Sequence, residues 1–184
     1  MRPLEECRAR AARLKLMVFD VDGVLTDGSL YFTDAGTEIK AFNTRDGQGM
    51  RMLQNAGVTL AIITGRDAAC VTWRMKNLGI EHVYQGIGHK LTTFHSLLAK
   101  VGVQAHEAGF MGDDVIDLQV MAACGFSAAP ADCHELNRQH ADYLAGHAGG
   151  RGAVREVCDF ILAAQGKLDA VLARYLPSPL TDAK

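Results

Sequence analysis

Short apolar runs that stop abruptly at polar residues place the strongest limit on how this chain can fold. Residues 14–19 form a compact apolar run that ends at Asp20, and residues 58–63 form a second run that ends at Thr64. Such a run fits a strand that is buried on both faces, as in a parallel sheet. Weaker strand candidates are residues 82–84, 108–111, 126–129 and 141–144.

Stretches with helical character separate these runs. We expect helices at residues 5–13, 48–56, 68–78, 90–101, 115–123, 133–140 and 152–164. Gly57, Gly79, Gly102 and Gly125 stand where four of these helices should stop, as glycines in a C-terminal cap do. The alternation of strand and helix predicts an α/β fold with a doubly wound, mainly parallel sheet of the Rossmann-like kind.

One segment interrupts this alternation. Residues 30–33 and 37–42 flank a turn that contains Gly36, which predicts a β-hairpin. A chain of 184 residues fits a single domain. Within it, residues 28–42 form the hairpin insertion, and residues 166–184 form a tail that we expect to be mobile or docked onto a neighbouring subunit.

The hairpin also indicates an oligomer. If its apolar side chains were exposed, they would form a larger apolar patch than a monomer usually shows. We therefore expect the hairpins of several subunits to pack together, the alternative being a hairpin that folds back onto its own subunit. The side chains are Leu30, Tyr31, Phe32, Ile39 and Phe42.

Charge and cysteine content exclude several classes of function. The 19 basic and 21 acidic residues give a net charge of −2, which does not favour binding to nucleic acid or to an anionic membrane. The five cysteines are an odd number without a C-x-x-C pair, so neither a disulfide framework nor a structural zinc site is expected. No signal peptide or bilayer-spanning run is visible, and we expect a soluble, cytoplasmic protein.

The motif with the clearest chemical meaning directly follows the first strand. Asp20 and Asp22 belong to the run D-V-D-G-V-L-T-D-G. Because ligands of open α/β sheets bind at the carboxyl ends of the strands, both carboxylates can face such a crevice. They suit Mg²⁺ binding or attack on an electrophile, the alternative being a polar turn.

Three further motifs follow later strands. Thr64 and Gly65 can donate hydrogen bonds to a phosphate oxygen, although a Thr-Gly pair is also an ordinary turn. Lys90 can neutralise phosphate charge, although a solvated surface lysine is the default interpretation. Acidic residues at the end of the fourth strand repel one another unless a cation compensates them, which favours metal binding. These residues are Asp113, Asp114 and Asp117.

Together these motifs resemble those of the haloacid-dehalogenase-like phosphatase superfamily. The segments K-A-F-N-T-R-D-G at 40–47 and G-G-R-G-A-V-R-E at 149–156 look like the 3-deoxy-D-manno-octulosonate 8-phosphate phosphatases of lipopolysaccharide synthesis. The short connection between Asp27 and Gly47 leaves no room for the cap domain of many superfamily members. The resemblance further implies a homotetramer.

The resemblance also implies roles for the motif residues. Asp20 would be the nucleophile that forms an aspartyl-phosphate, and Asp22 would protonate the leaving sugar oxygen and then activate water. Mg²⁺ would be held by the carboxylates of Asp20 and Asp113 and by the backbone carbonyl of Asp22. Thr64 and Lys90 would offset phosphate charge. Asp114 and Asp117 would hold these residues in place without binding the phosphate themselves.

For a sugar-acid phosphate as substrate, residues with anion-binding side chains and the family's substrate loop are the candidates. Arginine matches both carboxylate and phosphate, although a surface ion pair is the alternative for each arginine. Arg151, in the glycine-rich run at 149–152, belongs to a flexible lid or to a plain loop. The predicted substrate residues are Asp22, Asn43, Thr44, Arg45, Asp46, Gly47, Arg51, Arg66, Arg74 and Lys90.

Three other interpretations remain open. The same chemistry can serve a nonulosonate 9-phosphate, and a phosphatase-like module without activity occurs in some sialic-acid activating enzymes. The retained motif residues argue against the inactive module. A sugar-phosphate mutase of the same superfamily normally needs the cap that this chain lacks.

Overall fold

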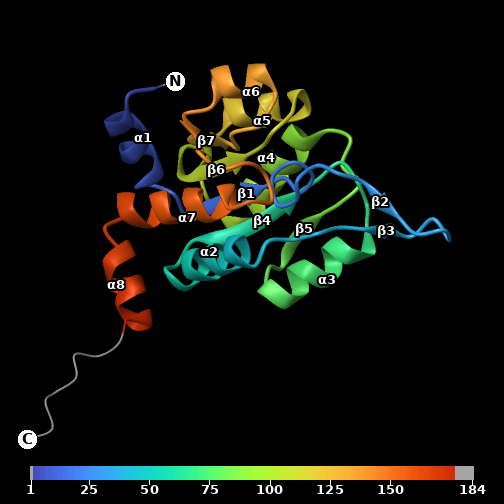
Figure 1. Ribbon diagram of the computed structural model, residues 1–184. Coiled ribbons are helices and arrows are strands. Elements are labelled where there is room, and N and C mark those ends of the chain that lie inside the picture. Colours follow the sequence, from blue (N-terminus) through green and yellow to red (C-terminus); the bar gives the residue numbers. More distant parts are fainter. Residues whose placement is uncertain (1, 177–184) are drawn as a thin grey trace, which may run out of the picture.

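A six-stranded parallel sheet forms the centre of the protein (Figure 1). The structure is a computed structural model and describes residues 2–176. It confirms the predicted doubly wound α/β fold, because every strand pairs in parallel with its neighbours. In spatial order the strands are β5 (His82–Tyr84), β4 (Thr59–Ile63), β1 (Leu16–Phe19), β6 (Ala108–Met111), β7 (Phe126–Ala129) and β8 (Tyr143–Leu144).

The central strands are buried along their whole length. Every residue of β1, β6 and β7 is buried, and only Thr59 of β4 is partly accessible. Helices on both faces cause this burial, which explains why these strands appear in the sequence as continuous apolar runs. The register pairs Phe19 of β1 with Ile62 of β4 and with Met111 of β6, so the three strands end at the same edge of the sheet.

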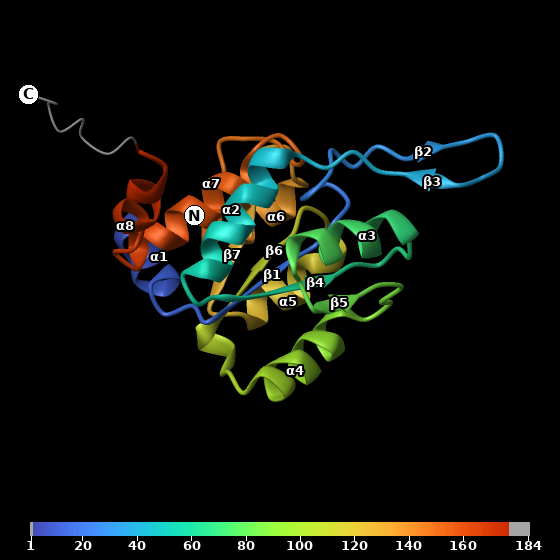
Figure 2. The same cartoon turned by 90° about the horizontal axis from the view of Figure 1, so that it is seen from below.

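Helices cover the two faces of the sheet and bury one apolar cluster each (Figure 2). The short 3₁₀ turns η1 (Ala105–Glu107) and η2 (Val115–Asp117) precede β6 and α5. One face carries α1 (Leu4–Ala11), α2 (Thr44–Asn55), α3 (Ala69–Leu78) and α7 (Ala153–Ala164), and the other carries α4 (Lys90–Val101), α5 (Leu118–Ala123) and α6 (Glu135–His140).

The glycine caps were predicted correctly for three helices. Gly57 follows Ala56, the C-cap residue of α2, and has a φ of 92°. Gly79 and Gly102 close α3 and α4 in the left-handed conformation, with φ of 72° and 76°. The prediction for Gly125 was wrong, because α5 ends at Ala123, its C-cap Cys124 is already extended, and Gly125 does not have a positive φ. A Cβ atom at Gly125 would lie 2.3 Å from the carbonyl oxygen of His106, so the glycine is there for a close backbone approach.

The predicted hairpin is present and leaves the body of the protein. It consists of β2 (Tyr31–Phe32) and β3 (Glu38–Ile39), which pair antiparallel and project beyond the sheet in Figure 2. Four of its apolar side chains are exposed, namely Leu30, Tyr31, Phe32 and Ile39. The fifth, Phe42, packs against the core instead, which corrects its assignment to the exposed patch.

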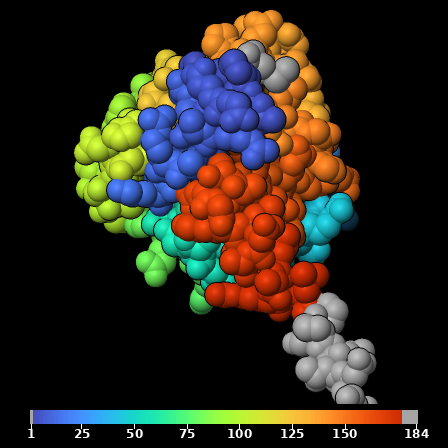
Figure 3. All heavy atoms as spheres, turned by 90° about the vertical axis from the view of Figure 1, so that its left-hand side faces the viewer, coloured from blue at the N-terminus to red at the C-terminus, as the bar shows by residue number. Residues whose placement is uncertain are grey.

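Segments from the two ends of the chain lie side by side (Figure 3). Helix α1 packs against α7, and α8 (Leu168–Leu172) with the 3₁₀ turn η3 (Ala173–Tyr175) continues over the same surface. The hydroxyl of Tyr175 accepts a hydrogen bond from Gln48 Nε2 at 2.8 Å. The first part of the expected tail therefore packs on its own chain, and residues 177–184 lie outside the described residues.

A membrane-crossing helix does not occur between residues 2 and 176, because none of the helices there is both long enough and apolar enough.

Candidate active site

Three charged side chains form a buried cluster beneath the carboxyl edge of the sheet. Lys90 Nζ lies 2.6 Å from Asp20 Oδ2 and 2.7 Å from Asp117 Oδ1. The side chain of Lys90 is only 2% exposed, so its interpretation as a solvated surface lysine was wrong. Asp20 follows β1, Lys90 opens α4 and Asp117 ends η2, so the fold brings together residues far apart in the sequence.

Asp20 sits in this cluster with a perturbed acidity. Burial and the neighbouring Asp117 carboxylate raise the pKa of Asp20 to about 6, although Lys90 and the backbone N–H of Val21 act in the opposite direction. That N–H donates to Asp20 Oδ1 at 2.7 Å. Because Lys90 and Val21 hold both oxygens, the carboxylate has a fixed orientation at the end of β1.

Asp113 completes an acidic group around Asp20. Burial and the carboxylates of Asp20, Asp117 and Asp114 raise the pKa of Asp113 to about 8. Gly23 is required beside it, because a Cβ atom there would lie 2.0 Å from Asp113 Oδ2 and because its φ is 80°. The loop after β1 and the loop after β6 are therefore packed directly against each other at this point.

The donor set fits a divalent cation. One carboxylate oxygen from each of Asp20, Asp113 and Asp117 lies within 4.8 Å of the other two. Asp117 also has structural partners, because its Oδ1 accepts from Lys90 and its Oδ2 accepts from the backbone N–H groups of Asp113 and Asp114 at 3.1 and 3.3 Å. Crowded oxygen donors suit Mg²⁺, which prefers hard ligands and would remove their mutual repulsion.

Asp22 has a different set of partners from Asp20. Lys40 Nζ contacts Asp22 Oδ1 and lies 2.6 Å from Glu38 Oε1, and the second oxygen of Glu38 lies 2.8 Å from the guanidinium of Arg66. We call these four residues the hairpin-root network. It joins the loop after β1 to the base of the hairpin and to the loop after β4.

An open cavity of about 240 Å³ lies over these groups. Thr64 is held at its edge by backbone hydrogen bonds, since its N–H donates to Tyr84 O at 3.0 Å and its carbonyl accepts from Ile87 N at 3.1 Å. The cavity lining contains four carboxylates and one guanidinium, that of Arg66. An anionic ligand therefore needs an additional cation there. The lining residues are Asp20, Asp22, Gly23, Gly28, Thr64, Gly65, Arg66, Asp113, Asp114 and Ile116.

The glycine-rich run at 149–152 packs tightly against the loop after β1, which contradicts a flexible lid. A Cβ atom at Gly149 would lie 1.9 Å from Gly23 O, and Gly150 N–H donates to Val24 O at 2.9 Å. Arg151 pairs with Asp27 at 3.1 Å. The glycines allow two backbones to approach each other closely, and the run supports the loop after β1.

The predicted substrate segment 43–47 lies at the start of α2. Asn43 caps this helix by accepting from Arg45 N–H at 2.8 Å, and its Nδ2 donates to Gly150 O at 3.2 Å. Asp46 is buried and accepts from the N–H groups of Gly152 and Arg155, so it caps α7. Thr44 is the first residue of α2.

The predicted arginines do not gather around one point. Arg66 lines the cavity, whereas Arg51 donates to Asn77 O at 2.5 Å on the outside of α2. Arg74 donates to Asn43 O at 3.3 Å and fills the space beside Gly47, where a Cβ atom would lie 2.2 Å from its guanidinium. Arg45 is exposed at the first turn of α2.

Three residues of the site were missed in the sequence. Lys40 and Glu38 belong to the hairpin-root network, and their signal in the sequence is that two charged residues alternate with apolar ones along the second hairpin strand. In the structure Lys40 is buried and Glu38 is half-buried. Asn137 is fully buried, and its Nδ2 donates to Asp114 O at 2.8 Å, which fixes the acidic loop. No sequence spacing indicates the Asn137 contact, because it depends on how α6 packs.

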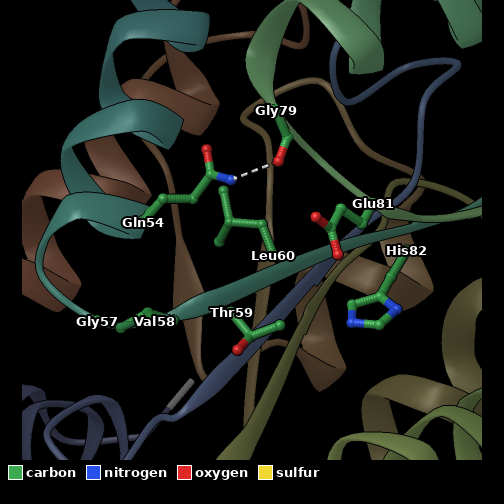
Figure 4. Close-up of a pocket in the computed structure, with 8 residues that line it drawn as sticks. All are labelled: Gln54, Gly57, Val58, Thr59, Leu60, Gly79, Glu81 and His82. Carbon is green, nitrogen blue, oxygen red and sulfur yellow. Dashed lines mark hydrogen bonds between the residues drawn. The ribbon is translucent and has the colours of Figure 1, made fainter.

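A second hollow, of about 380 Å³, lies at the opposite edge of the sheet, where β4 and β5 begin (Figure 4). Gln54 Nε2 donates to Gly79 O across it at 3.2 Å. Of its lining residues, only Glu81 and His82 have acidic or basic side chains, and the charged groups gathered around Asp20 are at the other end of the strands. We therefore place the candidate active site at the cavity over Asp20.

Comparisons with known proteins identify the relatives of this chain. The chain is 50% identical over 161 residues to 3-deoxy-D-manno-octulosonate 8-phosphate phosphatase KdsC of Escherichia coli K12, which covers 88% of this chain and 86% of the relative. No protein-family model matches the chain.

Solved structures give the same result. The phosphatase of this name from Moraxella catarrhalis, in complex with magnesium ion, phosphate ion and KDO, superposes with a TM-score of 0.93 at 41% identity and covers 95% of this chain and 100% of its own. The phosphatase from Yersinia pestis superposes with a TM-score of 0.88 at 48% identity, covering 90% and 89% of the two chains.

Proposed function

This chain belongs to the 3-deoxy-D-manno-octulosonate 8-phosphate phosphatase family, and from that premise we propose that it hydrolyses this sugar-acid phosphate to the free sugar acid and phosphate. The reaction is Mg²⁺-dependent and serves lipopolysaccharide synthesis. The observation that carries the proposal is the buried contact of Lys90 with Asp20 beside Asp113, because it provides a nucleophile, a cation and a metal-binding carboxylate at one point.

Asp20 attacks phosphorus, and the bond between phosphorus and the sugar oxygen breaks as the aspartyl-phosphate forms. Asp22 gives its proton to the departing oxygen and then takes a proton from the water that releases phosphate. Lys90 and Thr64 stabilise the charge on the phosphoryl oxygens. Asp114 and Asp117 keep the acidic loop and Lys90 in place.

Residues for the metal are Asp20, Asp113 and the backbone carbonyl of Asp22. The chemistry that bound Mg²⁺ supplies is the screening of charge between the Asp20 carboxylate and the incoming phosphate. Support comes from the close approach of the carboxylate oxygens of Asp20 and Asp113, and from the burial and the neighbouring carboxylates that raise both pKa values.

For the sugar end, Arg66 is the best supported substrate residue, because it lines the cavity and Glu38 orients its guanidinium. Arg45 is the next candidate, since it is exposed beside the family's substrate loop. Contacts of Arg51 and Arg74 with backbone carbonyls favour structural tasks for both.

The decisive experiment is phosphate release from 3-deoxy-D-manno-octulosonate 8-phosphate and from a nonulosonate 9-phosphate, with Mg²⁺ and with excess chelator. We expect the eight-carbon substrate to have the higher kcat/KM and chelation to abolish turnover. Higher kcat/KM for the nonulosonate would favour the related phosphatase. Absence of turnover with every sugar phosphate would favour a non-catalytic module.

We further infer that the protein is a homotetramer and works in the cytoplasm. Support for assembly comes from the exposed side chains of the hairpin, and a tetramer is the form that the resemblance implies. The five cysteines are free thiols, which suits a reducing compartment.

A further inference from the structure

The hairpin-root network contains a buried lysine to which the proposed reaction gives no task. The side chain of Lys40 is 1% exposed, and those of its partners Asp22 and Glu38 are 21% and 13% exposed. In the surface pair Lys15–Glu107, by contrast, the lysine side chain is 64% exposed. A surface pair contributes little to stability, whereas a buried ammonium needs its partners and is fixed by them.

The position of Lys40 determines how Asp22 faces the cavity. Lys40 contacts only Oδ1 of Asp22, and within residues 2–176 no protein group donates to Oδ2. Because Asp22 lines the cavity, its two oxygens have separate surroundings: Oδ1 faces the hairpin root, and Oδ2 is available to a ligand. A group that transfers a proton has to lie within hydrogen-bond reach of the reacting oxygen.

Glu38 connects this arrangement to the sugar-binding side. One of its oxygens holds Lys40 and the other holds Arg66, so a single carboxylate fixes two cations that belong to different loops. Both Glu38 and Lys40 are close to the base of the hairpin, and β3 itself provides Glu38. Negative and positive charges alternate along the network, so each of its charged groups has a partner of opposite charge without any ligand.

We propose that Lys40 is a positioning residue that holds Asp22 with its free oxygen directed at the leaving group, and that Glu38 fixes Lys40 in turn. Lys40 is too buried to contact substrate, so it acts through Asp22. The inference rests on the proposed function, because it needs Asp22 to be the acid. A displacement of about 1 Å in such a group costs roughly 100-fold in rate.

The first test compares two leaving groups. Lys40→Met should lower kcat for a sugar phosphate by about 30- to 100-fold. It should lower the rate of the nitrophenolate burst from p-nitrophenyl phosphate, which reports only the first step, by less than about fivefold, because a nitrophenolate departs without protonation. KM should change by less than about threefold. Lys40→Arg should recover most of the lost rate, since it keeps the charge and the donors.

Controls separate positioning from folding. Lys76→Met removes an exposed lysine of α3 and should match the unmodified enzyme with both substrates. Glu38→Gln should reproduce the leaving-group dependence of Lys40→Met to a smaller extent, because Lys40 keeps its contact with Asp22. Thermal unfolding of each variant checks that the comparison uses folded protein.

A double-mutant cycle tests whether Lys40 acts through Asp22. In the Asp22→Asn background, Lys40→Met should lower the sugar-phosphate rate by no more than about twofold further, since the two changes remove one function. If the losses multiply, or if both substrates lose rate equally, Lys40 serves the fold and the inference is wrong while the proposed function stands. If the unmodified enzyme hydrolyses neither compound, the proposed function fails, and the inference fails with it.

Discussion

Asp20 and Asp22, both on the loop after β1, have different partners. This difference fits the two tasks that we propose for them, attack on phosphorus and proton transfer. Asp20 is buried against Lys90 and the backbone, which leaves a rigid carboxylate suited to attack. Asp22 is partly accessible and holds one oxygen toward Lys40, which leaves the other free for proton transfer. Pairs of acids in contrasting environments are how a site divides such tasks.

The division of tasks predicts a leaving-group effect for Asp22→Asn. The amide cannot donate a carboxyl proton, so the rate with a sugar phosphate should fall by about 100-fold or more. The burst of nitrophenolate from p-nitrophenyl phosphate, which reports only the first step, should fall by less than about tenfold. Rapid-mixing kinetics with both compounds measure this. Equal losses would mean that Asp22 is not the acid.

The crowded carboxylates predict how pH and Mg²⁺ act on stability. The folded pKa of Asp113, about 8, lies above its ordinary value of 3.8, and that of Asp20 is about 6. Their contribution to the stability of the metal-free protein is therefore fully present below about pH 4 and is lost as pH rises toward 8. Because Mg²⁺ binds the ionised carboxylates, the Tm increase that it causes should be larger near pH 8 than near pH 5.

Thermal unfolding with and without Mg²⁺ at the two pH values measures this effect, with Asp113→Asn as the control. The control should show almost no Mg²⁺-dependent increase in Tm at either pH. An increase in the unmodified protein that is equal at both pH values, or larger at the lower one, would contradict the metal assignment.

At the scale of elements, α2 and α7 are joined by a side-chain cap. The carboxylate of Asp46 in α2 accepts from the N–H of Arg155 at 2.8 Å and from that of Gly152 at 3.3 Å, both at the start of α7. These N–H groups have no partner within the helix, since they belong to its first turn. Asp46 thus holds the glycine-rich run at 149–152 next to the loop after β1.

Asp46→Ala should therefore lower the free energy of unfolding by about 2 kcal/mol, because it leaves buried donors unsatisfied. Asp169→Ala, on the exposed side of α8, is the matched control and should change it by less than about 0.5 kcal/mol. Denaturant unfolding provides both values. If Asp46→Ala instead raises KM strongly with unchanged stability, Asp46 is a substrate residue, as the sequence predicted.

Elements with a regular apolar pattern could be predicted from the sequence. Elements whose bounds depend on a cap or on contacts with distant residues could not. The expected bounds of β5, β6, β7 and α4 agree with the structure. Helix α2 begins at Thr44, where Asn43 caps it, rather than at the expected residue 48. Gly47 and Gly49 interrupt the helical pattern of the sequence in the first half of this helix, so the earlier start was not predicted. These glycines make room for Arg74 and Arg155, which no local pattern reveals.

The same distinction applies to the site. Asp20, Thr64 and Asp113 were predictable because parallel strands end at one edge, so the residues after them meet. Lys40 was not predictable, because its contact with Asp22 depends on where the hairpin returns to the body. Arg51 and Arg74 are near the motifs in sequence only, and helix geometry directs them elsewhere.

For the whole molecule, the hairpin is the feature that a monomer does not explain. The exposed Tyr31 and Phe32 belong to β2, which projects beyond the sheet in Figure 2, whereas Phe19, Phe94, Phe110 and Phe126 are fully buried in the core. Since the base of the hairpin contains Glu38 and Lys40, the proposed assembly surface and the hairpin-root network belong to the same short segment.

The double change Tyr31→Asp and Phe32→Asp should convert the proposed tetramer into smaller species, because four charged patches cannot pack together. Light scattering on the purified proteins measures this. The change Trp73→Asp, at another exposed aromatic on α3, is the control and should leave the mass unaltered. A fully active monomer of the unmodified protein would contradict the role of the hairpin.

The central claim is that Asp20 carries the phosphoryl group between substrate and water. Acid quenching of Asp22→Asn during turnover of p-nitrophenyl phosphate, followed by peptide mass spectrometry, tests it directly. With this leaving group the variant should still form the intermediate and should hydrolyse it slowly. The account predicts the added mass of one phosphoryl group on the peptide that contains Asp20, dependent on Mg²⁺ and absent when Asp20→Asn is added. Phosphate release without any phosphorylated peptide, or a phosphoryl group on another residue, would contradict it.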